Sequence, residues 1–387
     1  MAVDIKQVAS IMNTVANEIL GAEAIVAEDL SNIVDIGKEI FDNTSVDVFT
    51  KKLVNHIGRV MVVDRIFKSG APNVFRDGWE YGSVLEKISF ELPEAEDNPK
   101  WNLVDGQSYD PHKFYAPKVE VKFFNQKETF QLPYSITDDQ IKASFSSAMQ
   151  VVAFVSGLET AVENGVTIRI MGLIERAINN MIGETMYAQH TDGTYTGNST
   201  ATAVNVLHLY NTEYAQTLTP ENCLKDKEFL RFMSETFGKY IDYLKTPMRK
   251  FNQGGKPRQT PRELLHFVVL SDVEKAAEYS LYSDTWHNQF VSLPYHEVVP
   301  FWQAPGDGPM TFANNSELHI TTASGHEVQP TGVLAVMFDH DAVMVTNQRE
   351  ETPSQYTPNA HFTTFWRQVD CGIFNDLDEN FVVFYVA

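Results

Sequence analysis

The longest periodic pattern of apolar residues in the chain runs from about Phe145 to Met186. Its apolar side chains recur at steps of three and four residues, which places them on one face of an α-helix. They are Met149, Val152, Val155, Leu158, Val162, Val166, Ile170, Leu173, Ile174, Ala177, Ile178 and Met181. A helix of this length spans about 60 Å at 1.5 Å per residue, more than a compact domain requires. The pattern therefore predicts one long helix that supports the rest of the fold, with a bend or short break at Asn164-Gly165.

Two shorter segments, 87–92 and 118–123, alternate apolar and polar residues, as strands with one covered face do. If they pair antiparallel, their apolar side chains share one face and their charged side chains share the other. The apolar residues are Ile88, Phe90, Leu92, Val119, Val121 and Phe123. The two segments predict a β-hairpin.

The connection between these strands, residues 93–117, is too long for an ordinary hairpin turn. It carries Trp101, Tyr109, Phe114 and Tyr115. Aromatic side chains in a long loop indicate either a surface that docks on another molecule or rings that pack back on their own hairpin. The residue pattern leaves both readings open.

The segments before the hairpin predict helices and one strand. Residues 1–40 are typical of one or two modest helices that form an N-terminal arm. Phe49, Leu53 and Ile57 at four-residue steps predict a further short helix, and the β-branched run VMVVDRIF at 60–67 predicts a strand.

The part of the chain after the long helix predicts a separate lobe. A Gly-, Thr- and Ser-rich segment at 190–203 marks the boundary. A helix over 219–246, a buried strand at 264–270 and a helix that begins at Ser271 then predict a mixed α/β lobe. From Val333 the pattern changes to strands, and we expect the last strands to return to the sheet beneath the long helix.

The loop after the helix over 219–246 is the basic cluster of an otherwise acidic chain. Its cations are Arg249, Lys250, Lys256, Arg258 and Arg262. Glycine and proline residues among them predict a loop. We expect these cations to bind carboxylates or another anionic partner, with a solvated loop tip as the alternative.

Composition narrows the class of protein. The 387 residues carry a formal net charge of -21, which argues against a surface built to bind nucleic acid or anionic lipid. Asp4, Lys6 and Glu18 interrupt any signal-peptide core, and no uninterrupted apolar run approaches the roughly 18 residues of a membrane helix. Cys223 and Cys371 are isolated, so neither a disulfide framework nor a zinc site is predicted. We expect a soluble protein of a reducing cytosol.

Motifs that would carry catalysis fail on inspection. GGK at 254–256 resembles the end of a phosphate-binding loop, but Pro257 stands where the magnesium-binding Ser or Thr belongs. His296-Glu297 begins like a zinc-peptidase helix, but Pro300 replaces the second His. The sequence DHD at 339–341 is typical of a solvated turn. No catalytic, cofactor-binding or metal-binding residue is predicted.

The order of these parts resembles the major capsid proteins of tailed bacteriophages, and is most similar to those of small podoviruses. The resemblance lies in KKLVNHIGRVMVV at 51–63, in KVEVKFFNQKETFQLPYSITDDQIKASF at 118–145, and in GVLAVMFDHDAVMV at 332–345 followed by FTTFWRQVDCGIF at 362–374. It implies an α+β protein with the tailed-phage capsid (Johnson, Hong Kong 97-like) fold. That fold has a spine helix, a peripheral β-sheet, an extended β-hairpin loop and a mixed α/β axial domain.

The resemblance also implies a division of the chain. Residues 1–58 would form an N-terminal arm and 59–133 the extended loop with its flanking strands. Residues 134–189 would form the peripheral domain with the spine helix, and 190–332 the axial domain at capsomer centres. Residues 333–387 would supply strands that return to the peripheral domain.

The function implied is that of a major capsid protein, assembled as pentamers and hexamers into an icosahedral shell in the host bacterial cytoplasm and located in the virion. The short region before the extended loop implies a separate scaffolding protein, with a portal and packaged double-stranded DNA as further partners and no membrane. The side chains expected at contacts between subunits are Trp101, Tyr109, Phe114, Tyr115, Arg249, Lys250, Lys256 and Arg258. A cellular nanocompartment shell of the same fold and an acidic intracellular enzyme are the alternatives.

Overall fold

The computed structural model describes residues 5–20, 26–27, 30–43, 48–49, 52, 72–76, 85–92, 105–106, 112, 114–116, 118–144, 148–190, 195, 199–282, 293, 295–304 and 306–387. The strand predicted over 60–67 lies outside these residues, as does most of the short helix predicted around Phe49.

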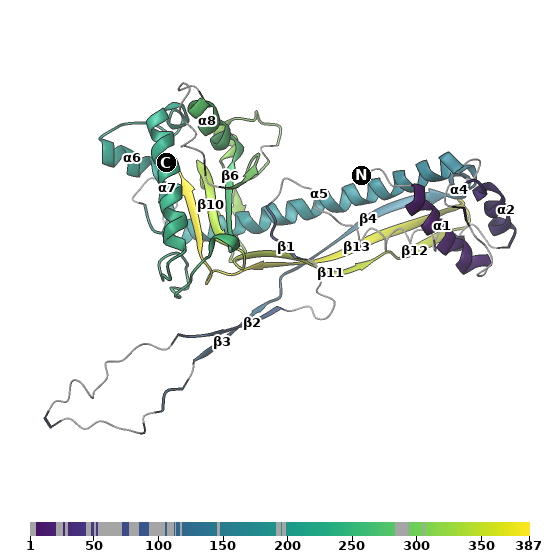
Figure 1. Ribbon diagram of the computed structural model, residues 1–387, viewed down its shortest axis with the longest axis horizontal. Helices are drawn as coiled ribbons and strands as arrows, with labels where there is room; N and C mark the ends of the chain where they lie inside the picture. The colour runs from purple at the N-terminus through teal and green to yellow at the C-terminus, as the bar shows by residue number, and fades with distance from the viewer. Residues whose placement is uncertain are drawn as a thin grey trace.

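The long helix predicted from the apolar pattern is α5, Ala148–Gln189, with 42 residues. It runs from the far end of the molecule into the lobe built around strands 265–270, 333–339 and 381–385, here called the axial lobe (Figure 1). The break allowed for at Asn164-Gly165 is absent, because the helix continues through both residues. Gly165 has a packing role: a Cβ at this position would lie 3.0 Å from Cδ1 of Leu132, so the missing side chain lets α5 approach the strand below it closely.

A five-stranded sheet, here called the peripheral sheet, lies along α5. Strand β13 (Phe362–Asn375) is its centre, with β4 (Lys127–Thr137) on one side and β11 (Val343–Glu351) and β12 (Ser354–Thr357) on the other. The short strand β1 (Phe75–Arg76) adds to β11 in parallel, and helix α4 (Asp138–Ser144) follows β4. Alternate residues of β4 are exposed, so one face of the sheet is covered and the other is open.

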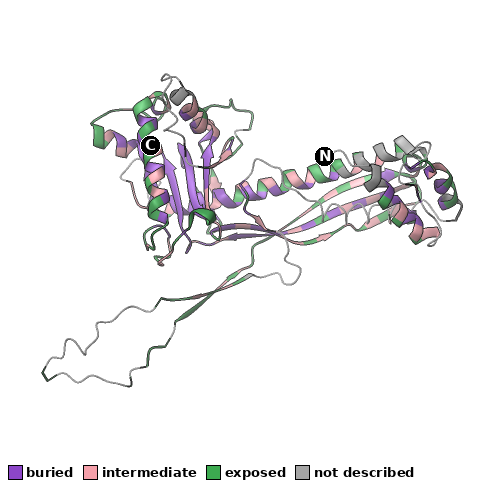
Figure 2. Cartoon of the chain, viewed as in Figure 1, coloured by how far each residue is buried: buried purple, intermediate pink, exposed green. Residues whose placement is uncertain are grey.

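A second five-stranded sheet forms the core of the axial lobe. Its order is β5 (Ala203–Asn205), β14 (Phe381–Tyr385), β10 (Val333–Asp339), β6 (Leu265–Leu270) and β7 (Glu297–Val299). Helices α6 (Val206–Tyr214), α7 (Lys227–Leu244) and α8 (Ser271–Tyr282) surround it in Figure 1. Figure 2 shows the strands of this sheet as the most continuously buried part of the molecule. The remaining short elements are η1 (Cys223–Lys225), η2 (Arg262–Leu264), α9 (Phe312–Asn315), β8 (Ile320–Thr321) and β9 (Glu327–Val328).

The prediction that all strands after Val333 return to the peripheral sheet is wrong for two of them. β11, β12 and β13 do return, whereas β10 and β14 pair with each other and with β6 and β5 of the axial sheet. Every residue of β10 and β14 is buried. An apolar run of this kind predicts a central strand, but it does not predict which strands pair with it. The turn predicted at 339–341 joins the two sheets rather than two strands of one hairpin.

The N-terminal residues form two helices, as predicted, and these pack against the far end of the peripheral sheet. They are α1 (Ile5–Leu20) and α2 (Ile33–Asn43). Met12 and Ile40 are fully buried there in a hydrophobic cluster that also holds Phe365 of β13 and Val162 of α5. This cluster is separate from the larger one around the axial sheet. Helix α5 contributes to both and links them.

Candidate functional site

The predicted hairpin is present as β2 (Leu85–Phe90) and β3 (Val119–Phe124), and it projects away from both sheets (Figure 1). The strands pair antiparallel with Ile88 opposite Val121 and Phe90 opposite Val119. Within the described residues these two strands form a sheet of their own.

The apolar face of the hairpin is exposed to solvent, as the green strands in Figure 2 show. Phe90 is 68% exposed and Phe123 is 65% exposed, and the other apolar residues of this face exceed 40%. The full set is Ile88, Phe90, Leu92, Val119, Val121 and Phe123. A contiguous exposed apolar face is typical of a surface that another molecule covers.

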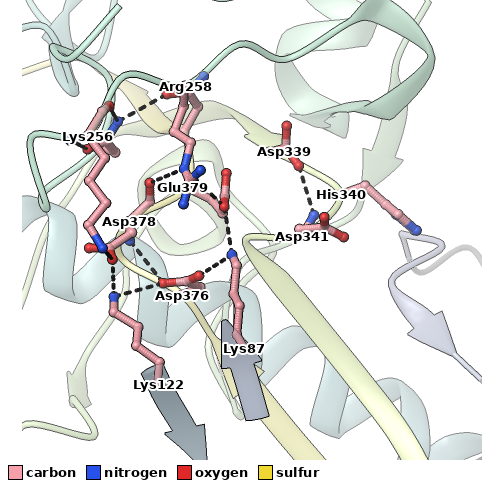
Figure 3. Close-up of polar contacts among 12 residues, drawn as sticks. Lys87, Lys122, Lys256, Arg258, Asp339, His340, Asp341, Asp376, Asp378 and Glu379 are labelled. Atoms are coloured by element: carbon pink, nitrogen blue, oxygen red, sulfur yellow. Dashed lines mark hydrogen bonds and ion pairs between the residues drawn. The ribbon is translucent and has the colours of Figure 1, made fainter. Parts of the chain in front are cut away.

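The opposite face of the hairpin carries charge and contacts the turn between β13 and β14. The carboxylates of Asp376, Asp378 and Glu379 in this turn are 4%, 9% and 10% exposed. Lys87 of β2 binds Asp376 and lies 2.6 Å from Glu379. Lys122 of β3 binds Asp378 and lies 3.1 Å from Asp376 (Figure 3).

The loop at 249–262, here called the basic loop, adds two cations to the same group of charges from the axial lobe. Lys256 binds Glu120 of β3 and lies 2.5 Å from Oδ2 of Asp378. Nε of Arg258 lies 3.2 Å from Oε1 of Glu379. Four cations thus meet four carboxylates at the base of the hairpin, and we call this group the base cluster: Lys87, Lys122, Lys256, Arg258, Glu120, Asp376, Asp378 and Glu379.

Gly254, one of the two glycines that resemble a phosphate-binding loop, packs closely against the acidic turn. A Cβ at this residue would lie 2.0 Å from Oδ1 of Asp378, so only glycine lets the basic loop approach the acidic turn. The backbone N–H groups of Gln253 and Gly254 donate to the carbonyl of Leu377 at 3.0 and 3.3 Å. The glycine serves contact between two parts of this chain.

We expect Gly254→Ala to lower the free energy of unfolding by roughly 1 to 3 kcal/mol, because the added methyl group must displace Asp378 or the loop. Urea denaturation measures this change. Gly238→Ala is the control, since a Cβ at that position of α7 meets no atom within 4 Å. The control is expected to be neutral or stabilising by up to about 1 kcal/mol, and a Gly254→Ala variant equal to it would contradict the close approach.

The carboxyl groups of the acidic turn differ in pKa. Burial raises the pKa of Asp376, but hydrogen bonds and charge from Lys87 and neighbouring groups outweigh burial, so the net pKa is lowered. The pKa of Asp378 is lowered in the same way, against burial, by Lys122 and the adjacent lysine of the basic loop. At Glu379 burial prevails and raises the pKa. On acidification Glu379 therefore takes up a proton before the two aspartates do.

The predicted contact residues fall into four groups. Trp101 and Tyr109 lie outside the described residues. Phe114 and Tyr115 belong to the long connection and are 86% and 62% exposed. Of the basic loop, Arg249 and Lys250 are exposed, whereas Lys256 and Arg258 belong to the base cluster.

Sequence reasoning missed the acidic turn at 376–379. Its signal was available as three carboxylates within four residues between two apolar strands, but such a pattern is also typical of a solvated turn. What makes these residues unusual is their burial, which only the tertiary structure shows.

The DHD segment and the two cysteines, which the sequence offered as candidate chemical groups, have structural positions. Asp339 accepts a hydrogen bond from the backbone N–H of Asp341 at 2.9 Å, so the DHD segment is a turn, as predicted. The turn is not fully solvated, because Asp339 is 6% exposed and also accepts a hydrogen bond from Oγ1 of Thr260 at 2.7 Å. Cys223 and Cys371 are both fully buried. Across the described parts of the chain there is no group of three metal-binding side chains, and no helix there is long and apolar enough to cross a membrane.

Comparison with known proteins assigns the chain to a family. The model of the family described as Phi29-like phage major capsid protein matches residues 11–385. Curated protein sequences give no match. Among solved structures, the capsid of Staphylococcus phage Andhra is 9% identical over 84% of this chain and 87% of its own, with a TM-score of 0.49. The capsid of cyanophage P-SCSP1u is 10% identical over 83% and 88%, with a TM-score of 0.42. Because the family match spans nearly the whole chain, the protein belongs to the Phi29-like phage major capsid proteins, with the α+β, Hong Kong 97-like fold that its sequence predicted.

Proposed function

We propose that copies of this subunit assemble as pentamers and hexamers into a closed icosahedral shell, and that a neighbouring subunit covers the apolar face of the hairpin. The observation that carries the proposal is the exposure of this face, where Phe90 and Phe123 are each about two-thirds open to solvent. A two-stranded hairpin is at best marginally stable in water unless something packs on it. In a shell, a neighbouring copy of the subunit would cover the hairpin of each subunit.

Further contacts between subunits are expected beyond the strands. Trp101, Tyr109, Phe114 and Tyr115 of the long connection are the proposed aromatic anchors, since aromatic side chains commonly carry much of the binding energy of an interface. Arg249 and Lys250 are exposed on the axial lobe and are proposed to meet a neighbour's carboxylates or DNA. For Lys256 and Arg258, their partners within the chain support a role in holding the hairpin instead.

The proposed setting follows from capsid function. A separate scaffolding protein and a portal would guide assembly in the cytoplasm of the host bacterium, and the finished shell would enclose double-stranded DNA as part of the virion. The net charge of -21 supports a shell that contains DNA without sequence-specific binding, because specific binding needs a concentrated basic surface.

A catalytic role has little support in the structure. A cleft beside α5, about 380 Å³ in volume, is lined largely by amide, hydroxyl and apolar groups. Glu175 and Arg176 are the charged residues among those described in its wall, and burial raises the pKa of Glu175. A single carboxyl group without a nucleophile or second acid beside it is a poor catalytic site. We therefore propose a structural protein without turnover of small substrates.

Expression of the subunit alone and together with its phage's scaffolding protein tests the proposal. We expect rings or closed shells in negative-stain micrographs and on a sucrose gradient when the scaffolding protein is present. A subunit that stays monomeric under every condition would contradict shell formation. Efficient shells without any scaffolding protein, formed around an enzyme cargo, would favour the nanocompartment alternative.

A further inference from the structure

The hairpin is held to the body mainly by charge. Its strands pair only with each other among the described residues, and its body-facing side chains are Lys87, Glu120 and Lys122 of the base cluster. The apolar contact at its root is Phe124, whose ring lies 6.0 Å from that of Phe374 in an edge-on arrangement. The direction in which the hairpin leaves the body therefore depends on ion pairs.

We propose that the base cluster is an electrostatic latch that sets the direction of the hairpin in the free subunit and so directs its apolar face outward. Lys87 and Lys122 come one from each strand and sit on the same turn (Figure 3). Two points of attachment resist rotation of the hairpin about its own axis. Lys256 adds a third, because it joins Glu120 of the hairpin to Asp378 of the turn.

The latch is firm at neutral pH because the three carboxylates of the acidic turn, Asp376, Asp378 and Glu379, are largely removed from water. With the hairpin in place the side chain of Asp376 is 4% exposed, and both of its lysine partners come from the hairpin, so turning the two lysines away would leave its charge without them. An ionised group left buried without a partner is strongly unfavourable. Exposed ion pairs impose no such penalty, which distinguishes this cluster from the scattered surface pairs of the chain.

The response of the latch to pH follows from all the charged groups that face it. These are Lys87 on β2, Glu120 and Lys122 on β3, Lys256 and Arg258 on the basic loop, Asp339 at the end of β10, and the three carboxylates of the turn. Protonation of Glu379 leaves Asp376 and Asp378 bound to the hairpin lysines. The lowered pKa values of these two aspartates mean that they stabilise the latch above the ordinary Asp value of about 3.9. That contribution is lost only as the pH falls through their lowered values.

Pulsed electron paramagnetic resonance distances in the full-length, unassembled subunit test the latch. One spin label goes on Leu92→Cys at the outer end of the hairpin stem and the other on Glu221→Cys of the axial lobe, both exposed positions. The native thiols stay unlabelled, because Cys223 and Cys371 are buried and burial raises the pKa of Cys223 to about 12. We expect one narrow distance distribution at pH 7.

Neutralising the latch should broaden that distribution and shift its mean. Lys87→Met with Lys122→Met removes the two hairpin cations that bind the acidic turn, and Asp376→Asn with Asp378→Asn removes the two carboxylates that they bind. Using both pairs keeps the test decisive if one variant folds poorly, and circular dichroism checks folding. Lys118→Met is the matched control, since Lys118 pairs with Glu91 within the hairpin and should leave the distribution narrow.

Two results would overturn the proposal. One is an unchanged distribution in a folded variant of either pair, which would mean that the backbone alone directs the hairpin. The other is a distribution of the unaltered chain that broadens already at pH 5, because Asp376 and Asp378 should still be ionised there. Both measurements use free subunits, so they stay informative even if shell formation fails.

Discussion

A subunit with Phe90→Ser and Phe123→Ser is expected to fold normally and to form no shells. Both rings are about two-thirds exposed, so their loss removes little packing from the free subunit. Surface substitutions of this kind usually change the free energy of unfolding by no more than about 0.5 kcal/mol. At an interface the same rings would contribute on the order of 2 kcal/mol each, and a shell repeats that loss at every contact.

Circular dichroism and a urea titration measure folding, and a sucrose gradient of the subunit co-expressed with the scaffolding protein measures assembly. Glu91→Gln, at the residue that directly follows β2, is the control and should assemble. A second variant removes residues 94–116 and joins the strands by an Asn-Gly turn, which suits a two-residue hairpin connection. Trp101→Ala and Tyr115→Ala then test the aromatic residues of the connection singly. Normal shells from the double serine variant would show that this face does not mediate assembly.

Arg367→Ala is expected to lower the free energy of unfolding by about 3 to 5 kcal/mol, the largest effect we expect on the free subunit. Arg367 of β13 forms an ion pair with Glu350 of β11, and the two side chains are only 6% and 7% exposed. Its guanidinium also donates to Oγ1 of Thr352 at 3.1 Å, and Asn347 donates to Glu350 at 2.7 Å. Without Arg367 the carboxylate of Glu350 remains buried and has lost its cation.

The control for this variant replaces both charges. Arg367→Met with Glu350→Leu removes the ion pair without leaving either charge alone, and such replacements are often neutral or stabilising. Urea denaturation of the single and double variants separates the two cases. A single variant that loses less than about 1 kcal/mol would indicate that water reaches Glu350, as it does at exposed pairs.

The elements of this protein follow largely from local sequence. Steps of three and four apolar residues predicted the long helix over 145–186, and α5 occupies Ala148–Gln189. Alternation in 87–92 and 118–123 predicted both strands of the hairpin and the face on which its apolar side chains lie. These predictions hold because each depends on residues a few positions apart, and because the period of a side-chain pattern depends only on the local backbone.

Pairings between distant parts of the chain were decided by the tertiary structure. β10 and β14 are buried on both faces, and such a run fits the centre of either sheet equally well. Lys256 appeared as a cation of an exposed loop, but its partners Glu120 and Asp378 lie far from it in sequence. Gly254 is required by a side chain of the acidic turn, and that turn becomes a buried charge site only when the hairpin and the basic loop meet it. A local pattern states which face of an element is apolar or charged, whereas the partner of that face depends on how the whole chain packs.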